Sequence, residues 1–231
     1  MRKDQENSSG VLYVVATPIG NLSDVSKRAL TTLAEVDLIA AEDTRVTRKL
    51  LTAFSIETPT TSLHQHTSNA KERTLVKDLV AGKSIAVVSD AGTPGISDPG
   101  QHFISMAINA GIEIIPIPGA SAVIAALSAS GFPSNRYTFV GFPPAKKGRA
   151  KFFTEINELS HAVVLYESKH RILKTLDALP QDRTAMIGRE LTKMHETIYR
   201  GTIAELKEQI AEKLKGEFVI VLAPDNFKLL K

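Results

Sequence analysis

The sequence predicts two α/β domains, the first with a mainly parallel sheet and the second with a mixed sheet. Short apolar runs alternate with helical patterns along most of the 231 residues. That alternation is typical of parallel strands joined by helices that cover both faces of a sheet. In the second half, two strand patterns follow one another too closely for a helical crossover, so we expect antiparallel pairing there.

The first half begins with a strand pattern at residues 11–17, rich in β-branched and aromatic residues. Asp24 is placed to cap the helix that follows. A further helix begins near residue 69 and should end at Gly82. The remaining strands are predicted at 36–41, 60–64, 84–89 and 112–117, and the remaining helices at 44–54 and 103–109.

The character of the chain changes around Pro116–Gly119. A helix of small residues follows and should end at Gly131. Later strands are predicted at 136–142, 161–167, 184–190, 195–202 and 216–224, with a helix at 203–214. We therefore expect domains at 11–117 and 118–231, after a polar and disordered segment at 1–10.

Composition excludes several classes of protein. With 43% hydrophobic and 23% charged residues the chain is not wholly disordered, and the absence of cysteine excludes disulfides and thiolate chemistry. The first ten residues lack the apolar core of a signal peptide, so the cytosol is the expected compartment. The histidines, among them His64 and His66, form no HExxH pattern, and we expect no metal.

The stretch "VVSDAGTPGISDPG" (Val87–Gly100) is the most informative segment. It places glycines, prolines and aspartates directly after a predicted buried strand, where open α/β sheets bind ligands. Glycine lets the backbone approach a ligand closely, although an ordinary loop with conformational demands has the same composition. Neither the Walker pattern nor the Rossmann spacing is present, which argues against a phosphate cradle and a nicotinamide site.

Together with "YVVATPIGNLSDVSKRAL", "AEDTR", "PGASA", "YESKHR" and "RELTKMHET", this stretch closely resembles the tetrapyrrole-methylase superfamily. The similarity runs from about Gly10 to Pro224 and is strongest to a branch that methylates RNA. It implies S-adenosylmethionine as methyl donor, held in a cleft between two α/β domains, and a homodimer. The implied reaction is methylation of the 2′-hydroxyl of a decoding-region cytidine of 16S rRNA in the small ribosomal subunit, cytidine 1402 in the usual numbering.

The resemblance also implies a set of donor-binding residues. Asp90 is the most distinctive of them, because a carboxylate among small residues after a buried strand is more often functional than structural. For Tyr166 and Leu191, packing in the core is an equally good explanation. The full set is Pro18, Asp90, Gly92, Thr93, Gly95, Ser121, Ala122, Tyr166 and Leu191.

A ribose hydroxyl needs positioning and benefits from a general base. Glu42 and Asp43 come first as candidates because they directly follow a strand, and His64 comes next. Asp43 has an alternative role as a helix cap. Glu167 and Glu190 are further possibilities from the second domain.

Basic residues gather in loops and at a helix start, which favours a basic rim that contacts RNA phosphates. The candidates are Arg45, Arg48, Lys49, Lys146, Lys147, Arg149, Lys169 and Arg171; Lys151 adds to the second group, and "RELTK" adds Arg189 and Lys193. Two alternatives remain open: a methyltransferase acting on a tetrapyrrole, and a ribosome-binding protein without catalytic activity.

Overall fold

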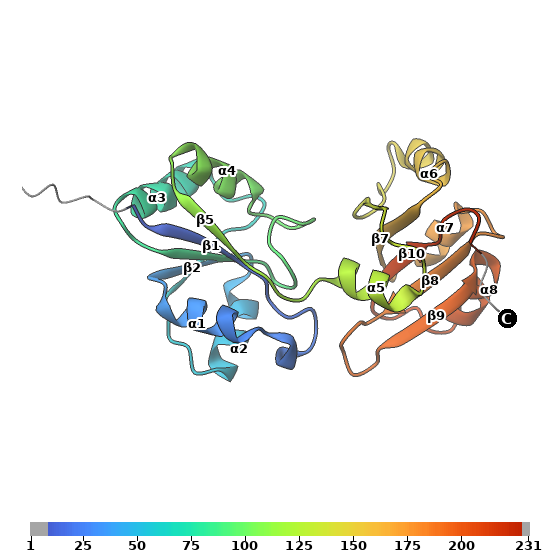
Figure 1. Cartoon of the computed structure of the whole chain (residues 1–231), viewed down its shortest axis with the longest axis horizontal. Helices are drawn as coiled ribbons and strands as arrows, with labels where there is room; N and C mark the ends of the chain where they lie inside the picture. The colour runs from blue at the N-terminus through green and yellow to red at the C-terminus, as the bar shows by residue number, and fades with distance from the viewer. Residues whose placement is uncertain (1–8, 228–231) are drawn as a thin grey trace, which may run out of the picture. The chain divides into compact units, whose positions relative to one another are not determined.

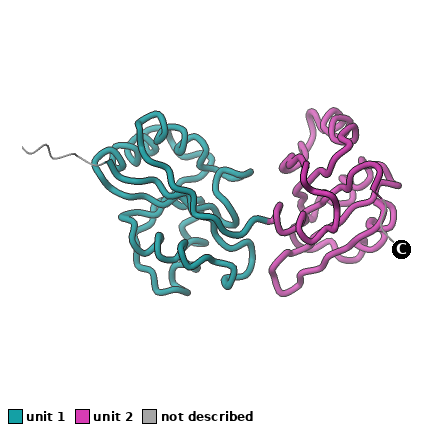
Figure 2. Tube along the Cα trace, viewed as in Figure 1, with its two compact units in different colours: residues 1–121 teal, residues 122–231 magenta. Residues whose placement is uncertain are grey.

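The structure is a computed structural model that describes residues 9–227, so the prediction for residues 1–10 lies almost entirely outside the described residues. The chain divides into two units, residues 1–121 (unit 1) and 122–231 (unit 2), as Figure 2 shows. Each unit contains one five-stranded sheet with helices packed against it (Figure 1). Within the described part of the chain, the helices are too short or too polar to cross a membrane.

Unit 1 contains a sheet in which every neighbouring pair of strands is parallel, as predicted. The strand order is β3-β2-β4-β1-β5. The strands are β1 (Val11–Val15), β2 (Leu38–Ala41), β3 (Thr60–Ser62), β4 (Ile85–Val88) and β5 (Glu113–Ile117). All four residues of β4 are buried, because this strand lies inside the sheet and both faces are covered.

Four helices cover the two faces of this sheet (Figure 1). The helices α1 (Lys27–Glu35) and α2 (Thr44–Ala53) pack on one face, where Leu33 and Leu51 share a core with Ile39. The helices α3 (Asn69–Val80) and α4 (Gln101–Asn109) pack on the other, where Leu79 and Phe103 share a core with Leu12. Alternate residues of each strand therefore face different helices.

The start of α1 differs from the prediction. Asp24 does not cap this helix, because it closes a short 3₁₀ turn (η1, Leu22–Asp24). The cap is Ser26, whose hydroxyl accepts a hydrogen bond from the Ala29 N–H at 3.1 Å. The end of α3 is as predicted: Gly82 follows it with a φ of +96°, a conformation that glycine adopts without steric cost.

Unit 2 contains the predicted mixed sheet, with strand order β6-β7-β10-β8-β9. Only β6 and β7 are parallel, and the close pair β8 and β9 forms the expected antiparallel hairpin. The strands are β6 (Tyr137–Phe139), β7 (Ala162–Ser168), β8 (Thr184–Arg189), β9 (Thr197–Thr202) and β10 (Glu217–Leu222). The helices are α5 (Ala122–Ser130), α6 (Arg149–Asn157), α7 (Ile172–Asp177) and α8 (Ile203–Ile210).

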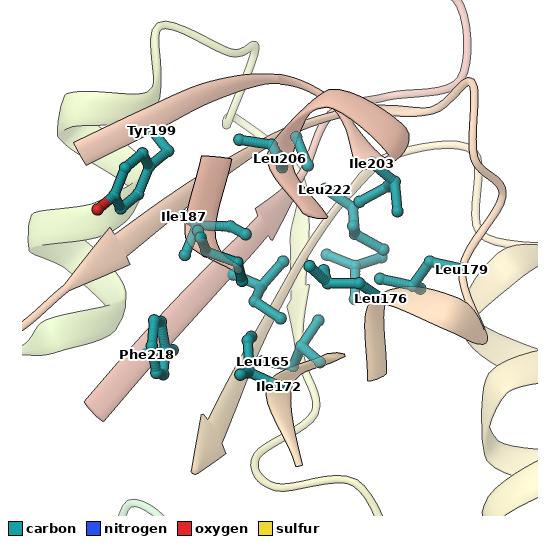
Figure 3. Packing of buried hydrophobic residues seen from close by; sticks show 14 of the residues in the cluster. Leu165, Ile172, Leu176, Leu179, Ile187, Tyr199, Ile203, Leu206, Phe218 and Leu222 are labelled. Atoms are coloured by element: carbon teal, nitrogen blue, oxygen red, sulfur yellow. The ribbon is translucent and has the colours of Figure 1, made fainter. Parts of the chain in front are cut away.

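The core of unit 2 lies between this sheet and the helices α6, α7 and α8. Leu165, Ile220 and Ile187 stand opposite one another on the three central strands, and all three are fully buried. Figure 3 shows Leu165 and Ile187 in this layer, with Ile172 and Leu176 of α7 against it. The helix α5 packs against β7, β8 and β10 and contributes further buried residues such as Val123 and Leu127.

Candidate functional site

The candidate site lies in unit 1, where the parallel strands end. The strand β1 connects through α1 to β2, whereas its neighbour β4 connects through α4 to β5 on the opposite side. Adjacent strands whose connections leave in opposite directions open a crevice at their carboxyl ends, which is where open α/β sheets bind ligands. We call this region the carboxyl-edge site; it comprises residues 16–21, 42–43 and 89–100.

Two loops of this site are joined by an isolated antiparallel bridge between Thr17 and Gly92. The Thr17 N–H donates to the Gly92 carbonyl at 2.9 Å, and the Gly92 N–H donates to the Thr17 carbonyl at 3.0 Å. The buried Thr17 hydroxyl also donates to the Ser89 carbonyl at 3.1 Å. The loop after β1, which carries Pro18, is thus fixed against residues 89–100, which we call the glycine loop.

The glycines of the glycine loop have conformations that other residues rarely adopt. Gly92 and Gly95 both have a φ of +79°. A Cβ on Gly92 would stand 3.4 Å from the Ile19 side chain, and one on Gly119 would stand 3.0 Å from the Cβ of Ala16. The positive φ angles therefore favour glycine at positions 92 and 95, whereas the close approach to Ala16 favours glycine at position 119. Thr93 is half-buried between Gly92 and the buried Pro94.

Glu42 and Asp90 are linked across the ends of β2 and β4. The Asp90 N–H donates to Glu42 Oε2 at 3.2 Å, and the Asp43 N–H donates to Asp90 Oδ1 at 3.0 Å. Partial burial is the main cause that raises the pKa of both Glu42 and Asp90, and the neighbouring carboxylates add to it. The structure therefore brings together Glu42, a candidate general base, and Asp90, a predicted donor-binding residue.

Asp98 is a functional candidate that the sequence did not single out. Burial raises its pKa from 3.8 to about 6, and the charges of Glu42 and Asp90 act in the same direction, while a hydrogen bond from the Ser89 side chain opposes them. A carboxyl group with such a pKa in a ligand-binding crevice is well suited to accept a proton near neutral pH. The available signal was its place in the glycine loop, eight residues after Asp90.

Asp43 has the capping role that the sequence left open. Its carboxylate caps α2 by accepting the Arg45 N–H at 2.8 Å, and it also pairs with the Arg45 guanidinium at 2.6 Å. These hydrogen bonds lower the pKa of Asp43 to about 2. A group that stays ionised down to that pH is a weak base.

His64 follows β3, at the same edge of the sheet but beyond β2. It is exposed, and its Nδ1 accepts the His66 N–H at 3.1 Å. Among the described residues no hydrogen bond or ion pair joins it to Glu42, Asp90 or Asp98, and its catalytic role stays a prediction. Residues 9–227 also contain no group of three potential ligands placed to hold a metal ion.

The predicted basic residues of unit 1 lie together on α2. Arg45, Arg48 and Lys49 line a shallow depression of about 540 Å³ with Thr52 and Ala53. All three basic residues are exposed, and α2 begins directly after Asp43. The helix therefore presents positive charge beside the carboxyl-edge site.

Two of the predicted donor-binding residues, Tyr166 and Leu191, lie on β7 and in the turn after β8. Tyr166 is half-buried, with its ring 4.9 Å from that of Phe139 and 5.4 Å from that of Phe142. Leu191 is 8% exposed and sits in a turn between Glu190 and Thr192, which both have positive φ angles. Such strained turns persist only where the surroundings enforce them.

The turn around Leu191 has other notable features. A Cβ on Gly188 would stand 2.8 Å from Leu191 Cδ2, so a larger residue at position 188 would force the Leu191 side chain to shift. The Thr192 hydroxyl is buried and has no hydrogen-bond partner. Burial acts to raise the pKa of Glu190, but hydrogen bonds from the Glu217 N–H and from Lys193 together outweigh it, so the pKa is lowered and the carboxylate is a weak base.

The remaining predicted residues lie at loops and at the boundary of the units. Ser121 is the last residue of unit 1 and Ala122 the first of α5. Lys146, Lys147 and Lys169 are exposed, whereas Arg149 and Arg171 are half-buried and hydrogen-bonded within unit 2. None of these contacts tests donor or RNA binding, so these assignments stay predictions.

Comparison with known families and sequences gave consistent matches. Residues 11–207 match the family model described as Tetrapyrrole (Corrin/Porphyrin) Methylases. The chain is 49% identical over 228 residues to a Vibrio cholerae protein named "Ribosomal RNA small subunit methyltransferase I", covering 95% of this chain and 79% of that protein. A Synechocystis protein of the same name is 49% identical over 220 residues, covering 93% and 79%.

Solved structures show the same fold at low sequence identity. A diphthine synthase superposes with a TM-score of 0.72 at 16% identity, covering 93% of this chain and 90% of that one. A uroporphyrin-III C-methyl transferase from Thermus thermophilus, complexed with S-adenyl homocysteine, superposes with a TM-score of 0.64 at 14% identity, covering 93% and 97%. At these identities the likeness concerns the fold alone.

Proposed function

Because the chain belongs to the tetrapyrrole (corrin/porphyrin) methylase family, we propose that it is an S-adenosylmethionine-dependent methyltransferase that acts on the RNA of the small ribosomal subunit. The substrate is supported by the 49% identity to relatives named for that activity. The structural observation that carries the proposal is the switch point between β1 and β4, where two bridged loops line the carboxyl-edge site. The finer proposal is 2′-O-methylation of the decoding-region cytidine.

The residues of the carboxyl-edge site fit a bulky polar cofactor. Gly92 and Gly95, with their positive φ angles, shape the glycine loop, and the exposed Asp90 and half-buried Thr93 supply polar groups there. When bound, S-adenosylmethionine supplies an electrophilic methyl group on a sulfonium. Pro18, Gly92, Thr93 and Asp90 would hold it in unit 1.

The acceptor hydroxyl needs a base, and we assign that role to Asp98. Its pKa of about 6 leaves it mostly ionised at neutral pH, yet basic enough to accept a proton from a positioned hydroxyl. Burial is the main cause of that raised pKa, and the charges of Glu42 and Asp90 add to it. Glu42 itself is held by the Asp90 N–H, so in this assignment it tunes Asp98 and does not take the proton.

The proposal is tested by incubating the full chain with S-adenosylmethionine labelled in the methyl group and small ribosomal subunits that lack the modification. Label in 16S rRNA, located to a ribose by nuclease mapping and mass spectrometry, is the expected result. Uroporphyrinogen in a parallel reaction tests the tetrapyrrole alternative. Label in the tetrapyrrole with none in RNA would overturn the proposed substrate, and no transfer to either would favour a binding protein without activity.

Replacing Asp90 by alanine is expected to weaken donor binding about tenfold while the fold persists. The carboxylate is exposed, so its loss leaves no cavity in the core. Calorimetric titration with S-adenosylhomocysteine measures the affinity, and circular dichroism checks the fold. Because Asp90 also accepts the Asp43 N–H, Asp90→Asn, which keeps an acceptor there, serves as the control for that lost hydrogen bond. Unchanged affinity in a folded Asp90→Ala variant would refute the assignment.

Removing two cations from α2 is expected to reduce the salt dependence of RNA binding. If Arg48 and Lys49 contact phosphates, the double variant Arg48→Ala/Lys49→Ala should flatten the slope of log affinity against log salt by about 1.4, at about 0.7 per contact on single-stranded RNA. Filter binding between 50 and 300 mM salt measures this slope. Lys207→Ala, which removes a partly exposed charge paired with Asp177, is the control. An unaltered slope in the double variant argues against α2 as an RNA contact.

A further inference from the structure

The loop that follows β6 carries an exposed aromatic side chain among basic residues. The Phe142 side chain is 54% exposed, whereas most large apolar side chains in unit 2 are buried. Lys146 and Lys147 follow on the same loop and are exposed. Neither lysine side chain has an ion-pair partner in the described part of the chain, and residues 141–151 contain no acidic side chain.

The ring of Phe142 lies against a neighbouring ring and is more than half exposed. It lies 5.4 Å from the Tyr166 ring in a tilted arrangement, and Tyr166 in turn lies 4.9 Å from the Phe139 ring. Phe139 belongs to β6 and Tyr166 to β7, so a row of rings begins on the sheet and ends at Phe142. The outermost ring therefore has a supported side and a side open to solvent.

The backbone of the loop is fixed at several points. Gly141 and Gly148 bound it with φ angles of +64° and +82°, and the Gly141 carbonyl accepts the Tyr166 N–H at 3.0 Å. The Arg171 guanidinium donates to the Pro143 carbonyl at 2.9 Å. The Arg149 guanidinium donates to the Pro144 carbonyl at 3.2 Å. Two half-buried arginines thus hold the two prolines that follow Phe142.

Both arginines depend on one buried carboxylate. The Glu167 side chain is fully buried and pairs with Arg171 Nε at 2.9 Å. Its other oxygen accepts the Thr175 hydroxyl at 2.5 Å, and Thr175 accepts a hydrogen bond from Arg149 at 2.8 Å. A buried charge that is fully paired in this way is costly to disturb, so it fixes both guanidinium groups.

We propose that residues 141–148 form a binding site for one unpaired RNA nucleotide, with its base stacked on Phe142 and its phosphates contacted by Lys146 and Lys147. The choice of RNA as partner rests on the proposed function. The chemistry agrees with it, because unpaired bases stack on aromatic rings while lysines follow the backbone. Glu167 is a positioning residue, acting through Arg149 and Arg171. In this proposal Arg149 and Arg171 hold the loop, and Lys146 and Lys147 contact phosphate.

The test is binding of the full chain to a fluorescent single-stranded RNA with the sequence around the modified cytidine. Phe142→Ala is expected to weaken binding about tenfold, and Phe142→Leu to behave like it, whereas Phe142→Trp restores affinity because stacking needs a ring. Tyr137→Ala, which removes a 41% exposed ring outside the loop, is the matched control. Equal affinity of Phe142→Ala, Phe142→Leu and the wild type would overturn the stacking site.

The lysines and Glu167 have readouts of their own. Lys146→Ala/Lys147→Ala should flatten the salt slope, whereas Lys213→Ala, at an exposed lysine after α8, should not. Glu167→Gln should raise the KM for RNA with a smaller effect on kcat. If Glu167→Gln does not fold, Arg171→Lys is measured in its place. A lower melting temperature with an unchanged KM would reduce Glu167 to a structural role and contradict its positioning role.

Failure of this proposal is distinguishable from failure of the proposed function. If the wild type methylates small subunits and Phe142→Ala has wild-type RNA affinity, the stacking site is wrong and the function stands. If the wild type transfers no methyl group to RNA but binds the oligonucleotide through Phe142, the site stands and the assigned reaction fails.

Discussion

Asp98→Asn is expected to lower the rate of methyl transfer about 100-fold or more. Asparagine has nearly the same shape but cannot accept a proton, and a positioned general base typically contributes a factor of this size. Asp98 is the carboxyl group of the carboxyl-edge site whose pKa, about 6, is best matched to that task. Single-turnover transfer to small subunits, with donor and enzyme in excess, measures the chemical step apart from product release.

The pH profile of the wild type is a second readout of the same assignment. The base acts when ionised, so the single-turnover rate should fall as the pH drops below about 6 and level off above it. Asp182→Asn, at an exposed aspartate of unit 2, should keep both the rate and the profile. A folded Asp98→Asn variant with the wild-type rate at pH 8 would remove Asp98 from the mechanism and return Glu42 to first place.

The same substitution should stabilise the protein at neutral pH. The folded-state pKa of Asp98 lies above its ordinary value of 3.8, so the folded state binds the proton more tightly than the unfolded state does. Its favourable contribution is complete below about pH 4 and is lost as the pH rises through about 6. Allowing for partial solvent exposure, Asp98→Asn should raise the free energy of unfolding at pH 8 by about 1–2 kcal/mol, and by less at pH 4.

Much of unit 1 was predictable because its signals are local. A buried parallel strand such as β4 appears in the sequence as an uninterrupted apolar run, and the glycine loop after it is marked by its composition. The sequence placed Glu42 and Asp90 after separate strands, and their hydrogen bond follows from the parallel pairing of β2 and β4, whose carboxyl ends meet at one edge. The loop bridge through Thr17 was not predicted, because it joins backbone groups 75 positions apart.

What escaped prediction depends on burial and on competition between neighbouring groups. Asp98 resembles any loop aspartate until the fold places it beside Glu42 and removes part of its water. Arg171 belongs to a basic run in the sequence, yet the buried Glu167 turns it inward to the Pro143 carbonyl. Asp24 and Ser26 are both good caps, and only the 3₁₀ turn decides that Ser26 caps α1.

Ile220→Ala is expected to lower the free energy of unfolding of unit 2 by about 3–5 kcal/mol. Ile220 lies on β10, the central strand of the mixed sheet, between Leu165 and Ile187, and none of the three is exposed. Removing its side chain leaves a cavity between the sheet and the helices. Leu165 and Ile187 lie on strands paired with β10, so they cannot move in to close it. Ile220→Val, which removes one methylene, should cost about 0.5–1.5 kcal/mol.

Urea unfolding measured by circular dichroism gives these free energies, and hydrogen exchange detected by mass spectrometry assigns the loss to a unit. Because the chain has two units, exchange should rise in β7, β8 and β10 of the Ile220→Ala variant while the strands of unit 1 keep their protection. Ile108→Ala, at a 57% exposed position of α4, should stay within about 0.5 kcal/mol of the wild type. An equal loss of protection in both units would mean that they unfold as one body. A decrease of only about 1 kcal/mol in the free energy of unfolding of Ile220→Ala would mean that the layer around Leu165 and Ile187 closes the cavity.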